Sequence, residues 1–198
     1  MATVPEPPAE LRPNTSPVTE RSSSPPSGRM GNLGLWLRDL IFSALASILI
    51  ITFLYQPVRV EGTSMLPRLE DHDRLFINKF VYHLERINRG DIVVFRYPRD
   101  EEKSYIKRVI GLPGDRLAID KGRVYINGVP ISEPYVPEIY RDERSYDEIT
   151  IPPDHYFMMG DHRSISSDSR DFGPVARELI YGKAVFVYWP TKDAGVLR

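Results

Sequence analysis

The chain contains 198 residues, with 26 lysine and arginine residues against 27 aspartate and glutamate residues, and no cysteine. The net charge of -1 argues against nucleic acid as the main partner, because phosphate binding requires an excess of basic side chains. The absence of cysteine excludes disulfide frameworks, thiol nucleophiles and cysteine-based zinc sites. The length allows one domain of about 100–150 residues together with additional segments.

Seven of the 18 prolines lie within the first 26 residues, among serine, threonine and glutamate. Apolar side chains are too sparse there to offset the entropy cost of ordering the chain. We therefore expect residues 1–31 to be disordered, as a solvated tail or as a polyproline docking segment.

An uncharged run of 19 residues extends from Leu40 to Val58. As a helix it would be about 28 Å long, close to the ~30 Å hydrocarbon core of a bilayer. Trp36 lies before it and Tyr55 near its end, as aromatic residues do at membrane interfaces. The alternatives are a cleavable signal peptide, although no small-x-small site follows the run, and a buried core helix, although the run has no clear polar stripe. We expect a transmembrane anchor over residues 35–56.

The charges beside this run do not fix its orientation, because three arginines lie within 20 residues on each side. These are Arg21, Arg29 and Arg38 before the run and Arg59, Arg68 and Arg74 after it.

From Val58 onward, short β-type runs alternate with turn residues. The expected strands are Val58–Glu61, Arg74–Asn78, Asp91–Tyr97, Ser104–Ile110, Arg116–Asp120, Arg123–Ile126, His155–Met159 and Lys183–Tyr188. Asn127-Gly128 between two of these runs is a strong hairpin signal. Helix is limited to Lys79–Arg86 and a short turn from Pro174 to Ile180.

Residues 132–150 hold eight charges and two prolines, so we expect a solvent-exposed excursion there. The predicted fold class is mainly β: an antiparallel, partly closed β-domain over residues 57–198, after one N-terminal transmembrane helix.

Three stretches could carry chemistry. Ser64 lies in VEGTSMLPRL, two residues after a glycine that allows close backbone approach. Lys107 lies in YIKRVIGLPGD and shares a strand face with Tyr105 and Val109. Such a lysine is either partly desolvated, which lowers its pKa, or simply extends its amine to solvent or an ion pair. The loop MMGDHRSISSDSRDFGPV is dense in aspartate and serine, which cap backbone groups or orient a neighbouring side chain.

Together with RGDIVVFRYP, these stretches resemble type I signal peptidases, the Ser/Lys endopeptidases that remove export signals. The four motifs of that family occur in order as GTSMLP, RGDIVVF, YIKRVIGLPGD and GDHRSISSDSRDFG. The resemblance covers roughly residues 55–190, in addition to the preceding apolar run.

The resemblance implies that Ser64 is the nucleophile and Lys107 the general base, which takes the hydroxyl proton during attack on the scissile carbonyl. Lysine has an ordinary pKa of about 10.4, so this role requires burial of the amine. Ser166 matches the serine that orients the lysine. The backbone N–H of Ser64 would supply one oxyanion donor. Some family members have a second donor, a serine hydroxyl, at the position of Gly62, so here that donor stays open between backbone and water.

By the same resemblance, four charged residues form ion pairs beneath the site: Arg108, Asp161, Asp168 and Arg170. Val58–Gly62 and Ser104–Lys107 match the two edges between which the family binds an extended substrate. The apolar residues implied to line a shallow pocket for small side chains, as in Ala-x-Ala, are Val58, Val60, Met65, Leu69, Tyr105 and Ile106.

One departure from the family pattern is His162: the family usually has Gly-Asp-Asn-Arg, whereas this chain has Gly-Asp-His-Arg at residues 160–163. It replaces an amide hydrogen bond or, alternatively, acts as the base for Ser64 in a conventional triad. The interval from Lys107 to Gly160 is short, so the large extra β-domain of some members is absent.

No metal or cofactor is suggested, since the histidines are dispersed and no phosphate-binding glycine loop is present. The implied partners are signal-peptide-bearing preproteins, the lipid bilayer and the export machinery, with no nucleic acid. The implied location is a bacterial cytoplasmic membrane, with the catalytic domain on the outer face. Two other functions stay open: a non-catalytic domain that holds export substrates, and a self-cleaving Ser/Lys relative coupled to DNA binding.

Overall fold

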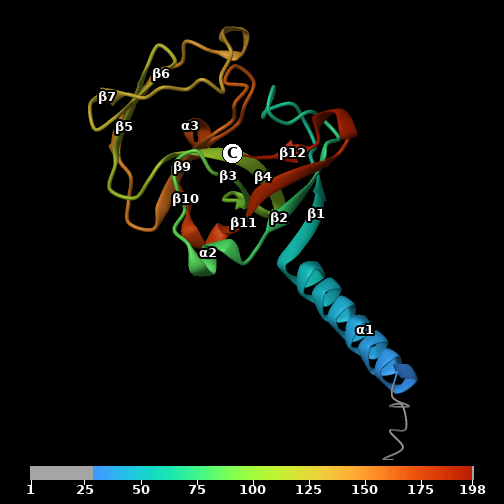
Figure 1. The fold of residues 1–198 in the computed structure, drawn as a ribbon. Coiled ribbons are helices and arrows are strands. Elements are labelled where there is room, and N and C mark those ends of the chain that lie inside the picture. The colour runs from blue at the N-terminus through green and yellow to red at the C-terminus, as the bar shows by residue number, and fades with distance from the viewer. Residues whose placement is uncertain (1–28, 198) are drawn as a thin grey trace, which may run out of the picture. The chain divides into compact units, whose positions relative to one another are not determined.

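The computed structural model describes residues 29–197. They begin with helix α1 (Arg29–Leu54), of which Leu33–Leu54 is apolar, exposed and long enough to cross a bilayer (Figure 1). The expected anchor at 35–56 overlaps this helix, but Tyr55 and Gln56 already belong to the first strand. Residues 1–28 of the expected tail lie outside the described residues. The described residues divide after Ala44 into two units, and the following paragraphs concern the second.

The larger sheet has eight strands, and every pairing in it is antiparallel. The strand order is β1-β2-β11-β3-β4-β9-β10, and β12 pairs with β11. The strands are β1 (Tyr55–Arg59), β2 (Arg74–Asn78), β3 (Ile92–Tyr97), β4 (Asp100–Gly111), β9 (His155–Met159), β10 (Val175–Ala176), β11 (Ile180–Trp189) and β12 (Gly195–Val196).

A smaller antiparallel sheet has the order β7-β6-β5-β8, and in Figure 1 its strands β5–β7 lie to one side of the larger sheet. Its strands are β5 (Arg116–Asp120), β6 (Arg123–Ile126), β7 (Val129–Pro130) and β8 (Tyr146–Thr150). The hairpin at Asn127-Gly128 is confirmed, since both residues adopt the positive φ angles, 53° and 81°, that this two-residue turn requires. The antiparallel β class predicted from the sequence is also confirmed.

Several boundaries differ from the predictions because tertiary hydrogen bonds decide them. The strand predicted at Val58–Glu61 runs from Tyr55 to Arg59, and the Val60 N–H then donates to Asp73 at 2.8 Å. The predicted helix over residues 79–86 is shorter, α2 (Val81–Leu84), beginning where the Asn78 side chain accepts two backbone N–H groups. The remaining short elements are α3 (Ser169–Phe172) and three 3₁₀ turns at Glu138–Tyr140, Arg177–Leu179 and Thr191–Asp193.

The prediction of a solvent-exposed excursion over residues 132–150 is wrong in part. Glu133 and Val136 are buried, with 6% and 3% of their surfaces exposed, and residues 146–150 form β8. A count of charges does not reveal which of them have buried partners. Here the carboxylate of Glu133 binds the buried guanidinium of Arg163, and that of Asp142 binds the buried guanidinium of Arg170. Of these two carboxylates, that of Glu133 is the more deeply buried.

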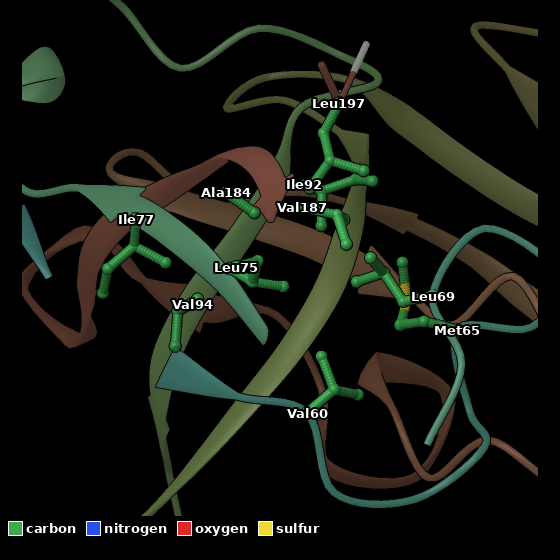
Figure 2. Packing of buried hydrophobic residues seen from close by; sticks show 10 residues of the cluster. All are labelled: Val60, Met65, Leu69, Leu75, Ile77, Ile92, Val94, Ala184, Val187 and Leu197. Carbon is green, nitrogen blue, oxygen red and sulfur yellow. The ribbon is translucent and has the colours of Figure 1, made fainter. Parts of the chain in front are cut away.

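The hydrophobic core consists of three clusters. One of them, drawn in Figure 2, packs the segment after Ser64 against the strands and the end of the chain. Its buried residues are Val60, Met65, Leu69, Leu75, Ile77, Ile92, Val94, Ala184, Val187 and Leu197. A second cluster contains Val93 and Phe95 and lies on the face of β3 opposite to Ile92 and Val94. A third cluster contains residues of both sheets, among them Ile110 and Phe157.

We expect Leu197→Ala to destabilise the protein by about 2–5 kcal/mol, because it removes a buried side chain from the cluster that holds Met65 and Leu69. Chemical denaturation measures the effect. Val196→Ala is the control: this neighbour is 60% exposed, so the expected change stays within about 0.5 kcal/mol. Equal losses for both variants would contradict the packing described here.

Candidate active site

A groove of about 720 Å³ lies between residues 58–64 and residues 103–107 of β4. These segments meet although three strands separate β1 from β4 in the sheet, so the sheet curves around the groove. β9 pairs with β4 only from Arg108 onward, and β1 is the end strand of the sheet. Within the described residues, both walls of the groove therefore expose unpaired strand edges.

Ser64 and Lys107 meet at the floor of this groove. The Nζ of Lys107 donates a hydrogen bond of 2.7 Å to the Oγ of Ser64 and another of 3.2 Å to the carbonyl of Ile106. Lys107 is fixed by its place in β4, opposite Val93. The carbonyl of Ser64 accepts the backbone N–H of His162 at 3.1 Å. Ser64 is thus held by His162, 98 residues further along the chain, whereas Lys107, 43 residues after Ser64, is held by its own strand.

The amine of Lys107 is poorly solvated, since 4% of the residue is exposed. Burial lowers its pKa to about 8, against the opposing effect of the negative charges of Asp168 and Asp161. The ring of Tyr105 lies 5.3 Å from the amine and covers part of it. At a pKa of about 8, roughly a tenth of the lysine is neutral at pH 7, compared with less than a thousandth for an exposed lysine.

Two buried ion pairs lie beside this pair. Arg108 binds Asp161 through two hydrogen bonds of 2.8 and 2.6 Å, and Arg170 binds Asp168 through two of 2.8 Å. Asp168 also accepts the N–H of Gly160 and caps α3. Such bidentate pairs fix geometry as well as charge. The four charged residues singled out in the sequence are thus brought together in two pairs.

The structure places Ser166 close to this site without the expected contact to the lysine. Its Oγ is buried and has no hydrogen-bond partner among residues 29–197. A Cβ added to Gly160 would clash with it, so the hydroxyl packs against that glycine.

Gly62 does not offer a free donor to an oxyanion. Its N–H donates to the carboxylate of Asp71 at 2.9 Å, and its φ angle of +91° is one that glycine adopts without strain. The N–H of Ser64, in contrast, makes no hydrogen bond to any described residue.

The six apolar residues expected around a substrate pocket separate into two groups. Val58, Val60, Tyr105 and Ile106 line the groove. Met65 and Leu69 do not line it, because they are buried in the core, with 1% and 0% of their surfaces exposed.

His162 contacts the loop that carries Ser64 but not the hydroxyl oxygen of Ser64. Its Nδ1 lies 3.2 Å from the carbonyl oxygen of Thr63, and its ring packs against Tyr140. The hydroxyl of Ser64 is bonded to Lys107 instead, so the alternative triad is not formed.

Sequence reasoning missed four side chains near the site: Asp71, Glu133, Tyr135 and Asp142. Asp71 holds Gly62, whereas Glu133, Tyr135 and Asp142 contact the buried arginines. They lie outside the four motifs, and their only signal was a charged or aromatic residue in an otherwise ordinary loop. In the part of the chain that the structure describes, no cluster of three or more histidine, aspartate or glutamate side chains is arranged to hold a metal ion.

Comparison with known proteins defines the class. Residues 33–189 match the family model described as signal peptidase, peptidase S26, which makes the chain a serine peptidase. It is 36% identical over 187 residues to signal peptidase I of Bacillus licheniformis, covering 89% of this chain and 97% of that one. It is 35% identical over 167 residues to signal peptidase I T of Bacillus subtilis, covering 80% and 86%.

The chain is also similar to the crystal structure of a signal peptidase I from Enterococcus faecalis, with 33% sequence identity and a TM-score of 0.44. The match covers 50% of this chain and 97% of the Enterococcus chain. The family match covers most of the chain. The chain belongs to the signal peptidase I family, and the family resemblance noted in its motifs is confirmed.

Proposed function

We propose that this signal peptidase uses Ser64 as its nucleophile and Lys107 as its general base. One observation carries this proposal: a buried amine of lowered pKa donates to the serine hydroxyl at 2.7 Å. Neutral Lys107 takes the proton as Ser64 Oγ attacks the scissile carbonyl, and it then protonates the leaving amine. Water activated by the same amine releases the acyl group.

The oxyanion of the tetrahedral intermediate binds the free N–H of Ser64. Because the Gly62 N–H is held by Asp71, a second donor comes from bound water or from the substrate-bound rearrangement of this loop. Each such donor is worth about 2.7–4 kcal/mol in the transition state. Ser166, packed beneath, positions the lysine through a rotation of its unpartnered hydroxyl.

The substrate is an extended segment of a preprotein that pairs with the open edges of the groove. Alternate side chains of an extended segment point the same way. Val58, Val60, Tyr105 and Ile106 therefore receive the residues one and three places before the cut, and their closeness favours small residues such as alanine.

The apolar helix α1 anchors the enzyme in a bacterial cytoplasmic membrane, and the peptidase domain lies on the outer face, where exported preproteins emerge from the export machinery. The short link between Leu54 and Ser64 keeps the nucleophile within about 35 Å of the end of α1. Cleavage sites close to the bilayer are therefore within its reach.

The test is to incubate the full chain, in lipid nanodiscs, with a preprotein bearing an Ala-x-Ala site and to map the new N-terminus by mass. Cleavage after the second alanine is expected. Replacing that alanine with phenylalanine should lower kcat/KM by about 10- to 100-fold, because overfilling a packed site costs about 1–3 kcal/mol. The same substitution at the intervening residue is the control. Equal sensitivity at both positions, or cleavage elsewhere, contradicts the proposed substrate geometry.

A further inference from the structure

The segment that leaves the smaller sheet carries a carboxylate into the interior beneath the catalytic groove. The side chain of Glu133 is 3% exposed and that of Arg163 is 2% exposed. The carboxylate accepts two hydrogen bonds from the Arg163 guanidinium, at 2.5 and 3.0 Å. A buried pair of this geometry is strongly directional, because both charges have lost their water.

Arg163 in turn holds the loop that touches the nucleophile. Its Nε donates to the carbonyl of Gly160 at 3.0 Å. Gly160 is packed so closely that an added Cβ would lie 2.5 Å from the carbonyl oxygen of Ser64. The same carbonyl accepts the N–H of His162. A continuous series of short contacts therefore runs from Glu133 to the peptide of Ser64.

Tyr135, two residues further along the same segment, reaches the other half of the site. Its hydroxyl donates to Glu133 at 3.1 Å, and its ring faces the guanidinium of Arg108 at 4.1 Å. Burial and the nearby charge of Glu133 raise the pKa of Tyr135, so the hydroxyl keeps its proton and remains a donor. Arg108 follows Lys107 in β4 and is clamped to Asp161.

The charges in this region balance. Two guanidinium groups, on Arg108 and Arg163, face two carboxylates, on Asp161 and Glu133, and all four are almost fully buried. Removing one carboxylate would leave a buried cation without its partner, which is far more costly than removing both members of a pair. The loop motif supplies Asp161 and Arg163, and the motif that contains Lys107 supplies Arg108. Of the four charges, that of Glu133 alone comes from outside the motifs.

We propose that Glu133, assisted by Tyr135, is a positioning residue for the Ser64–Lys107 pair. It fixes Arg163, and Arg163 fixes the loop that determines the position of Ser64 relative to the amine of Lys107. The smaller sheet thereby acts in catalysis as the support that delivers this carboxylate. This proposal rests on the roles proposed above for Ser64 and Lys107.

The first test compares Glu133→Gln with Glu138→Gln in the full chain. Glu138 is in the same segment, and its side chain is 89% exposed. We expect kcat for Glu133→Gln to fall about 10- to 100-fold, as for a reacting atom displaced by up to about 1 Å, with KM little changed. The acidic limb of the pH–rate profile should also move to higher pH, since a loosened loop admits water to the lysine. Glu138→Gln should match the wild type.

A second variant separates positioning from folding. Glu133→Leu/Arg163→Met removes both charges, which a purely structural role tolerates because buried ion pairs are often replaced by apolar groups without loss of stability. We expect this variant to melt near the wild-type temperature but to keep the low kcat, because the contact to Gly160 is lost. Tyr135→Phe, which removes a single hydroxyl, decides the question if both other variants fail to fold; its kcat should fall several-fold.

The proposal would be overturned if Glu133→Gln or the double variant folds and shows the wild-type kcat and pH profile. If neither folds, a wild-type kcat and pH profile in Tyr135→Phe would overturn it. Ser64→Ala, measured in parallel, keeps this outcome distinct from a failure of the proposed function. Full activity in Ser64→Ala would remove the catalytic assignment itself, whereas an inactive Ser64→Ala beside a fully active Glu133→Gln would remove only the positioning role.

Discussion

Replacing Lys107 with methionine is expected to abolish cleavage and, at the same time, to stabilise the protein at pH 7. Methionine fills a similar volume but cannot accept the proton of Ser64. We expect kcat to fall by about 10⁴-fold or more, the scale on which loss of a general base acts. Cleavage of a preprotein in nanodiscs measures this, and Lys121→Met, at an exposed turn, is the control.

The gain in stability follows from the lowered pKa of Lys107. The unfolded chain holds the proton up to a pKa of 10.5, whereas the folded protein releases it at about 8. Between pH 8 and 10.5 the unfolded state binds more protons than the folded state, so the free energy of unfolding rises with pH. Below pH 8 the buried, protonated amine therefore lowers the free energy of unfolding by its full amount. At about 1.4 kcal/mol per pKa unit, the penalty at pH 7 is about 3 kcal/mol. Methionine removes it, and the gain should shrink at pH 10.

The wild-type enzyme should show the same group in its kinetics. Its rate of acyl-enzyme formation is expected to rise with pH and to reach half of its maximum near the pKa of Lys107, about 8. A midpoint near 6.5 would instead identify a histidine as the base. Cleavage by Lys107→Met within tenfold of the wild-type rate would refute the assignment.

Gly160→Ala should also damage activity strongly, although less than Lys107→Met. The added Cβ would lie within 3.0 Å of the Ser166 hydroxyl and 2.5 Å from the carbonyl oxygen of Ser64, and the second neighbour is backbone that cannot rotate away. We expect kcat/KM to fall by about 100-fold or more, because the nucleophile must shift relative to the lysine. The free energy of unfolding should fall by about 1–3 kcal/mol.

Gly195→Ala provides the matched comparison, since its Cβ would meet no atom within 4 Å and its backbone is not in the left-handed region. Its activity and stability should stay close to those of the wild type. If Gly160→Ala retained wild-type kinetics, the loop after β9 would have to be more loosely packed against Ser64 than described above.

Sequence motifs and the alternation of apolar and polar residues predicted much of the fold and of the candidate site. The run without charges predicted the helix, and Asn127-Gly128 predicted a turn whose positive φ angles leave few alternatives. The pairing of Ser64 with Lys107 followed from family resemblance, since no local pattern states that residues 43 positions apart are in contact.

Other features depend on three-dimensional packing that local sequence does not encode. Met65 follows Ser64 directly and was expected at the pocket, but it is buried in a core cluster that also contains Leu197, from the other end of the chain. Glu133 was read as one charge among eight in a segment expected to be exposed. Its pairing with the buried Arg163, 30 residues further along the chain, distinguishes it from exposed neighbours such as Glu138.

The unpaired strand edges beside the groove have a consequence for the behaviour of the protein at high concentration. A vacant position in a sheet invites a strand of another copy, which leads to aggregation. Both strands that line the groove carry residues that oppose such pairing. Pro57 in β1 has no N–H to offer, and β4 begins with four successive charged residues, Asp100 to Lys103. Neutralising those four charges should promote fibre formation in concentrated preparations.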